Sequence, residues 1–240
     1  MPVQLDVVDP ARVAARSGIA LAIAGRAVTR TVDQRHIAFL LEKDDGSWWL
    51  VHLGWDNHFL AQPIEDGHAR AGHYGYAPVS LLHEYNEFAF KNWLFDLQAN
   101  NEGRIPYSIA LSDQPYFDQQ GNVKPFGIGE GFTCASFVKA VFEVYAIRLL
   151  DTGDWPVRES DAPWQRYILQ KLRETGGDPA KIAAQQPLIG QVARLRPEEV
   201  LGAAIALSET PADQRSPLPQ RVAEPLGGEV RGELVRLNKI

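Results

Sequence analysis

The sequence contains a single cysteine and a single methionine among its 240 residues. One cysteine cannot form a disulfide within the chain or supply a cysteine-based zinc site, so its thiol is either a buried structural group or a reactive one. No apolar run approaches the roughly 18 residues that an integral membrane span needs. A basic excess is also missing: the net charge of -6 argues against a general nucleic-acid binder.

The composition is otherwise that of a folded protein. Hydrophobic residues make up 45% and charged residues 22% of the chain, which is long enough for one large domain or for a domain with an appended segment. The apolar run Gly18–Gly25 has the length of a signal-peptide core, but two preceding aspartates and the following Arg26 favour a buried strand. We therefore expect a soluble protein, cytoplasmic by default, with export by another route left open.

Strand signals dominate the first third of the chain. Alternating or apolar runs predict strands at 3–8, 19–28, 36–42 and 48–54, and residues 55–78 have the composition of a polar loop. Asp45-Gly46 between the last two strands is typical of a tight antiparallel hairpin. Residues whose numbers sum to about 91 should then face each other, which puts His36 near Trp55 and His52 two or three positions away on the same face.

Helical periodicity dominates the remainder. Apolar residues at three- and four-residue steps predict helices at 80–98 and 133–150, separated by a long ordered loop over 104–131. Shorter helices are predicted at 164–175, 179–185 and 197–207, then a proline-rich tail or mobile arm over 208–225 and a short strand at 229–237. These elements suggest a core at 1–155, a helical extension packed on it at 156–207, and a proline-rich C-terminal arm at 208–240.

The cysteine stands at the start of the strongest predicted helix. Cys134 follows the glycine-rich stretch 127–131, and the free N–H groups and positive dipole end of a helix N-terminus would lower the pKa of its thiol. The N–H groups around Thr133 and Ala135 are candidates for holding an oxyanion. The alternative is a buried structural thiol, which is the usual state of a free cysteine.

A catalytic thiol needs a base, and the chain offers six histidines. His36 opens one strand of the predicted hairpin and His52 lies inside the next, so the two imidazoles can be neighbours. One would then act as the base while the other orients it through a ring N–H bond. The alternative for each is a semi-buried histidine that only satisfies its own hydrogen bonds.

These three residues together resemble a known family. Thr133-Cys134-Ala135-Ser136-Phe137-Val138, His36-Ile37-Ala38-Phe39-Leu40 and Leu50-Val51-His52-Leu53 are similar to the cysteine, histidine and polar-residue motifs of the papain-like NlpC-type hydrolases, although Ala135-Ser136 replaces the usual Ser-Gly. The order His, His, Cys resembles the circularly permuted branch, which includes YiiX-like proteins and the lecithin–retinol acyltransferase group. The resemblance covers about residues 33–150.

The resemblance implies a fold and a chemistry. The fold would be α+β, with a papain-like antiparallel sheet packed against the cysteine-bearing helix and an additional helical C-terminal segment. Cys134 would be the nucleophile, His36 the general base and His52 the orienting residue, with Tyr107, or alternatively Tyr116, lining the site. The implied activity is hydrolysis or acyl transfer at an amide or ester through a thioester, of the peptidase or amidase kind. Peptides, peptidoglycan-type peptides and lipid acyl groups are the implied substrates, with no metal or cofactor.

Two other function classes remain open. His68 and His73, with Glu65, Asp66, His58 and His83 nearby, would allow a histidine and carboxylate zinc site. A non-catalytic binding module on the same scaffold would instead use an aromatic surface, for which the candidates are Trp48, Trp49, Trp55, Tyr74 and Tyr76. An unreactive cysteine among exposed aromatic side chains would favour the second alternative.

Overall fold

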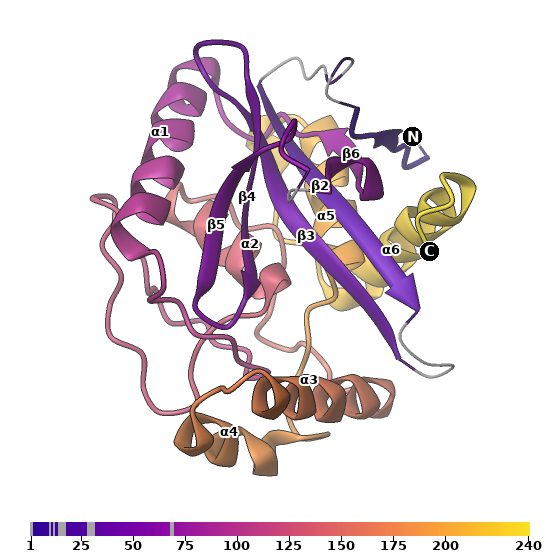
Figure 1. Ribbon diagram of the computed structural model, residues 1–240. Coiled ribbons are helices and arrows are strands. Elements are labelled where there is room, and N and C mark those ends of the chain that lie inside the picture. The colour runs from indigo at the N-terminus through magenta and orange to yellow at the C-terminus, as the bar shows by residue number, and fades with distance from the viewer. Residues whose placement is uncertain (1, 10, 12, 14–17, 28–31, 68–69) are drawn as a thin grey trace.

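A computed structural model describes residues 2–9, 11, 13, 18–27, 32–67 and 70–240 (Figure 1). Within these residues the chain forms a six-stranded antiparallel sheet and six α-helices. The strands are β1 (Asp6–Val7), β2 (Ile19–Ala27), β3 (Asp33–Glu42), β4 (Trp48–Trp55), β5 (His58–Pro63) and β6 (Gly75–Pro78). They are arranged in the order β1-β6-β2-β3-β4-β5, and every neighbouring pair is antiparallel.

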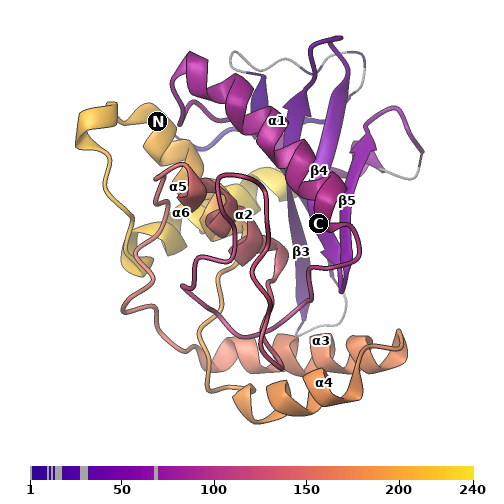
Figure 2. The same ribbon diagram turned by 90° about the vertical axis from the view of Figure 1, so that its left-hand side faces the viewer.

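Helices cover one face of this sheet. They are α1 (Glu84–Asn101), α2 (Cys134–Val144), α3 (Ala162–Glu174), α4 (Pro179–Gln185), α5 (Pro197–Glu209) and α6 (Gln220–Arg236). Figure 2 shows α1, α2 and α5 side by side against the sheet, while α3 and α4 lie together at one end of it. Their apolar sides and the odd-numbered residues of β2 and β3, such as Leu21 and Phe39, form the larger hydrophobic core.

The opposite face of the sheet carries a smaller apolar cluster. Even-numbered strand residues such as Ala22 and Leu40 pack there against Trp48, Tyr74 and Tyr76. Because successive side chains on a strand point to opposite faces, β3 serves two separate environments. This alternation decides which side chains can meet in each candidate site.

The structure confirms most of the expected sheet and corrects its details. The apolar run near the start is β2, in the interior of the sheet, although Val28 at its predicted end lies outside the described residues. The first strand is shorter than expected, and β5 and β6 lie within residues 55–78, which we had predicted as a loop. The hairpin register is one residue from the expected one, because Phe39 pairs with Val51. This register places His36 and His52 on the same face.

The largest correction concerns the C-terminal segment. We predicted a tail over 208–225 and a strand at 229–237, but α6 extends through most of this region. Ala223, Gly227, Val230 and Leu234 recur at three- and four-residue steps and are buried, so the segment forms an amphipathic helix that packs against α5. Its residues belong to the same hydrophobic core as the sheet, although residues 210–219 remain without a regular α-helix.

The other helices agree with the sequence to within a few residues at most ends. The cysteine-bearing helix is the exception, because α2 ends at Val144 rather than Leu150; the chain leaves the helix through Ala146, which has a positive φ of 58°. Residues 104–131 are irregular, as expected, with only isolated bridges such as Tyr107 to Phe132. Among the described residues, no helix is both long and apolar enough to cross a membrane.

Candidate active site

Cys134 occupies the first position of α2, where a capping box fixes the helix start. The Thr133 hydroxyl accepts a hydrogen bond from the N–H of Ser136 at 3.1 Å, and the Ser136 hydroxyl accepts one from the N–H of Thr133 at 2.9 Å. This reciprocal arrangement satisfies two N–H groups at the helix N-terminus and sets the entry angle of the chain. The cysteine is thereby held against the sheet.

The thiol contacts the backbone of β3 on both sides of His36. Its Sγ atom is 3.9 Å from the carbonyl oxygen of Arg35 and accepts a hydrogen bond from the N–H of Ile37. These two peptide groups flank His36 in the sequence. The structure therefore brings the cysteine to the backbone of the strand that carries His36, across 99 residues of chain, and the pairing of the thiol with the His36 ring stays a prediction.

Separation of two strands leaves room for this contact. The pairing of β3 with β4 covers only Phe39–Glu42, whereas the pairing of β3 with β2 extends to Asp33. Figure 1 shows β3 and β4 diverging beyond their shared ladder, with α2 behind the opening. The first half of β3 thus has backbone groups that β4 does not use, and the thiol meets them there.

The two predicted histidines form a direct hydrogen bond. Nε2 of His36 lies 2.7 Å from Nδ1 of His52, and the ring planes meet at 70°. A side-chain hydrogen bond with Gln62 on β5 raises the pKa of His52. Because Nδ1 of His52 faces His36, Nε2 is the ring nitrogen left for Gln62.

Either ring can be the donor in the hydrogen bond between His36 and His52, because the roles depend on the tautomer of each histidine. The tautomer assignment in which His36 donates from Nε2 leaves its Nδ1 as an unprotonated acceptor. The His36 ring lies on the face of the sheet away from the helices, whereas the contacts of the Cys134 sulfur with β3 are to backbone groups.

Burial keeps both imidazoles neutral. It lowers the pKa of His36 well below its ordinary value, with the neighbouring His52 acting in the same direction. Burial also lowers the pKa of His52 to about 4. At neutral pH the pair therefore carries no charge and can accept a proton only transiently.

The pKa of the cysteine departs from the sequence-based expectation. We expected a lowered value at the helix N-terminus, but burial raises the pKa of the Cys134 thiol. Hydrogen bonding from the N–H of Ile37 and the charge of Arg194 act in the opposite direction without overcoming it. The side chain is only 4% exposed, so loss of solvation outweighs the helix dipole and the resting group is a neutral thiol.

Tyr107, rather than Tyr116, is the tyrosine next to the cysteine. The Tyr107 hydroxyl interacts with both the backbone and the thiol of Cys134, and burial raises its pKa well above the ordinary value. Tyr116 instead donates to Glu130 at 2.8 Å. Gly131 allows the Tyr107 segment to pack here, because a Cβ at Gly131 would lie 2.3 Å from the carbonyl oxygen of Pro106.

The remaining predicted residues have defined local roles. The Thr133 side chain is occupied in the capping box, and Ala135 is fully buried in the hydrophobic core. The N–H of Ala135 is directed at the cysteine sulfur, where it helps to lower the pKa of the thiol. An oxyanion role for Thr133 and Ala135 remains a prediction.

A cavity of about 450 Å³ adjoins the histidine pair on the face opposite the helices. His36, His52 and Gln62 line it together with Arg70, His73 and Tyr74. The volume falls in the usual range for small-molecule sites, which is roughly 300–1,000 Å³. The Tyr74 ring lies 6.2 Å from the ring of His36, and burial raises the pKa of its hydroxyl.

The structure gives no support to either alternative site. The described residues contain no group of three or more His, Cys, Asp or Glu side chains that could hold a metal ion, and His68 lies outside them. The proposed aromatic surface is mostly internal, because Trp48, Tyr74 and Tyr76 are buried. Comparison with protein-family models, with curated proteins and with solved structures finds no match for this chain.

Sequence reasoning missed two members of the site and misplaced a third. Gln62 was assigned to a loop, because the strand over 58–63 is too short and polar to stand out, and Tyr74 was considered only as part of an aromatic surface. Arg194 lies in an irregular segment, and only the fold brings its charge near Cys134. The alternating apolar and polar residues around His52 could have indicated a neighbouring strand, but no local sequence pattern singled out Arg194.

Proposed function

We propose that this protein is a cysteine-dependent hydrolase or acyltransferase with a permuted papain-like arrangement. The observation that carries the proposal is the contact of the Cys134 sulfur with the peptide groups on both sides of His36. The His36–His52–Gln62 chain supports it, because it leaves one ring nitrogen of His36 free to accept a proton. The sequence resemblance to the lecithin–retinol acyltransferase group agrees with this assignment of roles.

The proposed reaction begins from a neutral thiol and a neutral imidazole. The reaction requires the His36 ring to reach the sulfur past the backbone of β3. Its Nδ1 then takes the thiol proton while Sγ attacks the carbonyl carbon of an ester or amide, forming the C–S bond and moving the carbonyl electron pair onto oxygen. His52 stabilises the resulting imidazolium by accepting from its Nε2–H. The Tyr107 hydroxyl, which is adjacent to the thiol, is positioned to donate to the oxyanion.

The intermediate then collapses to a thioester. The C–O or C–N bond of the substrate breaks, and His36 passes its proton to the leaving alcohol or amine. Water or an acceptor amine or alcohol attacks the thioester, with His36 again taking the proton. Release of the acyl product returns that proton to the cysteine sulfur, so the enzyme regains its starting state.

Trapping of the acyl-enzyme tests the proposal. The full chain would be incubated with p-nitrophenyl acetate, and the modified residue located by peptide mass spectrometry. We expect an acetyl group on Cys134 with a burst of nitrophenol, and a burst rate about 10²–10⁴-fold lower in His36→Ala. His83→Ala is the matched control, because His83 is exposed at the start of α1, outside the cavity.

Circular dichroism on each variant would show that the fold persists. Absence of an acetyl group on Cys134, or an unchanged burst rate in a folded His36→Ala variant, would overturn the proposal. Longer acyl esters and N-acyl peptides tested in the same assay would separate lipid acyl groups from peptide substrates. Acceptor amines added at millimolar concentration would separate acyl transfer from hydrolysis.

A further inference from the structure

A second cavity lies on the helical side of β3, away from the histidine pair. Its volume is about 240 Å³, and its lining comes from β3, the start of α3, the segment before α5, and α6. Arg35 lines this cavity, and its Nε lies 3.9 Å from a carboxylate oxygen of Glu198 on α5, which is beyond hydrogen-bond distance. Arg35 and His36 are consecutive on the strand, so their side chains point to opposite faces, and Arg35 is in the lining of both cavities.

Three buried donors in this lining have no hydrogen-bond partner among the described residues. They are Nε of Arg35, Nε of Arg194 and Nε1 of Trp164, and each residue is at least nine-tenths buried. The Arg194 guanidinium stacks on the Trp164 ring at 3.6 Å, so two of these donors are adjacent. A buried donor without a partner is destabilising, so three of them among the residues of one cavity lining favour an acceptor bound there.

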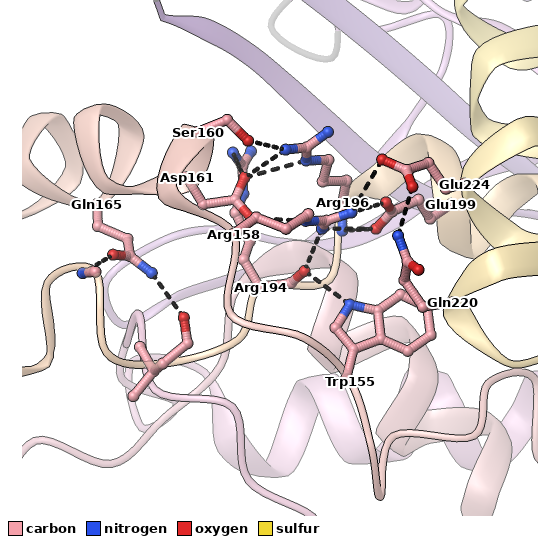
Figure 3. Close-up of polar contacts among 12 residues, drawn as sticks. Trp155, Arg158, Ser160, Asp161, Gln165, Arg194, Arg196, Glu199, Gln220 and Glu224 are labelled. Carbon is pink, nitrogen blue, oxygen red and sulfur yellow. Dashed lines mark hydrogen bonds and ion pairs between the residues drawn. The ribbon is translucent and has the colours of Figure 1, made fainter.

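Two of the three carboxylates in the lining, Asp161 and Asp33, are already paired with arginines. Figure 3 shows the side chains of Arg158, Arg194 and Arg196 converging on Asp161, which pairs with all three. Asp33 pairs with Arg35 and Arg231 in the same way. Four arginines face three carboxylates in the lining, so positive charge is in excess.

Arginine and the tryptophan ring nitrogen are donors only, so a ligand that satisfies them must supply acceptors. Oxygen atoms of a phosphate or carboxylate match the planar fork of arginine and also neutralise the excess charge. The cavity is smaller than the usual pocket for a drug-sized molecule, which suits an anionic group rather than a bulky ligand. We propose that this cavity is a binding site for an oxyanion, either a phosphate or a carboxylate group of a small molecule.

Calorimetric titration of the full chain tests the site without using any activity. Sodium phosphate, sodium acetate and sodium chloride would be titrated separately at constant ionic strength. We expect saturable binding of phosphate, acetate or both, and none of chloride. Tighter binding of phosphate would identify a phosphorylated ligand, and tighter binding of acetate a carboxylate ligand.

Trp164→Phe removes one orphan donor but keeps an aromatic ring beneath Arg194. We expect this variant to raise the Kd roughly tenfold or more, because it removes one hydrogen bond to a charged group. Trp93→Phe is the matched control: Trp93 is also buried, but its Nε1 donates to Asp118, outside the cavity. Its Kd should equal that of the wild type.

A second cavity variant keeps the test decisive if Trp164→Phe does not fold. Arg231→Gln removes a half-exposed arginine at the edge of the cavity and should also weaken binding. Arg221→Gln, an exposed position on the same helix, should not. The proposal fails if neither phosphate nor acetate binds the wild type, or if the folded cavity variants bind as tightly as their controls.

Discussion

Nε2 of His36 and Nδ1 of His52 share a hydrogen bond of 2.7 Å, in an environment that keeps both rings uncharged. This hydrogen bond occupies Nε2 of His36 and leaves Nδ1 as its other ring nitrogen. It also links the candidate catalytic site to the stability of the protein, because a histidine that burial keeps neutral in the folded chain is protonated at low pH in the unfolded chain.

Acidification below neutral pH should destabilise the protein through this pair. The pKa of His52 falls from its ordinary 6.5 to about 4 on folding, so between these values the unfolded chain binds a proton that the folded chain does not. The contribution of His52 to the free energy of unfolding is fully present above pH 6.5 and is lost as the pH falls toward 4. The loss is roughly 3 kcal/mol, at about 1.4 kcal/mol per unit of pKa. Urea unfolding of the wild type and His52→Gln at several pH values would measure this. An equal pH dependence in both proteins would contradict the assignment.

Gln62 should act as a positioning residue for His52. In Gln62→Leu the carbonyl acceptor is lost and the pKa of His52 should fall further, whereas in Gln62→Glu a carboxylate should raise it. Long-range proton–nitrogen NMR of the imidazole rings would report both the tautomers and the pKa. Gln98→Leu provides the control, because that amide contacts the carbonyl of Phe59 instead. Identical His52 spectra in the three variants would refute the tautomer assignment.

The capping box should stabilise the cysteine-bearing helix. Replacement of Thr133 by alanine removes the acceptor of the Ser136 N–H and should lower the free energy of unfolding by about 1 kcal/mol. Thr133→Ser keeps the hydroxyl and should retain most of that stability. Chemical denaturation with a common m-value would distinguish the two substitutions. Equal losses in both variants would point to packing of the threonine methyl group instead.

Arg158 should be far more important than an ordinary surface arginine. It hydrogen-bonds with Glu199 and Asp161, whose side chains are 2% and 1% exposed. Arg158→Met leaves Glu199 buried without this cation and should cost about 3–5 kcal/mol. The exposed Arg166 of α3 is the matched control, and its replacement by methionine should change stability by about 0.5 kcal/mol or less. Thermal unfolding of the two variants would separate these outcomes.

Local patterns were sufficient for much of the fold. Alternating strands, the Asp45-Gly46 hairpin and the Thr133 helix start are signals carried by a few neighbouring residues, and each corresponds to a described element. Errors arose where local signals were weak or misleading. The strand over 58–63 is short, and the prolines before Gln220 obscured the apolar stripe that makes α6 a helix once it packs on α5.

The sequence by itself determined the chemical groups of the candidate site and the helix start that presents Cys134. Only the tertiary structure decided where the sulfur lies, because its contact with the backbone beside His36 joins segments 99 residues apart. It also decided the protonation states: burial raises the pKa of the thiol and lowers those of both histidines, reversing the expectation from the helix dipole. Solvent exclusion depends on every element packed around a group, and no local pattern of residues records it.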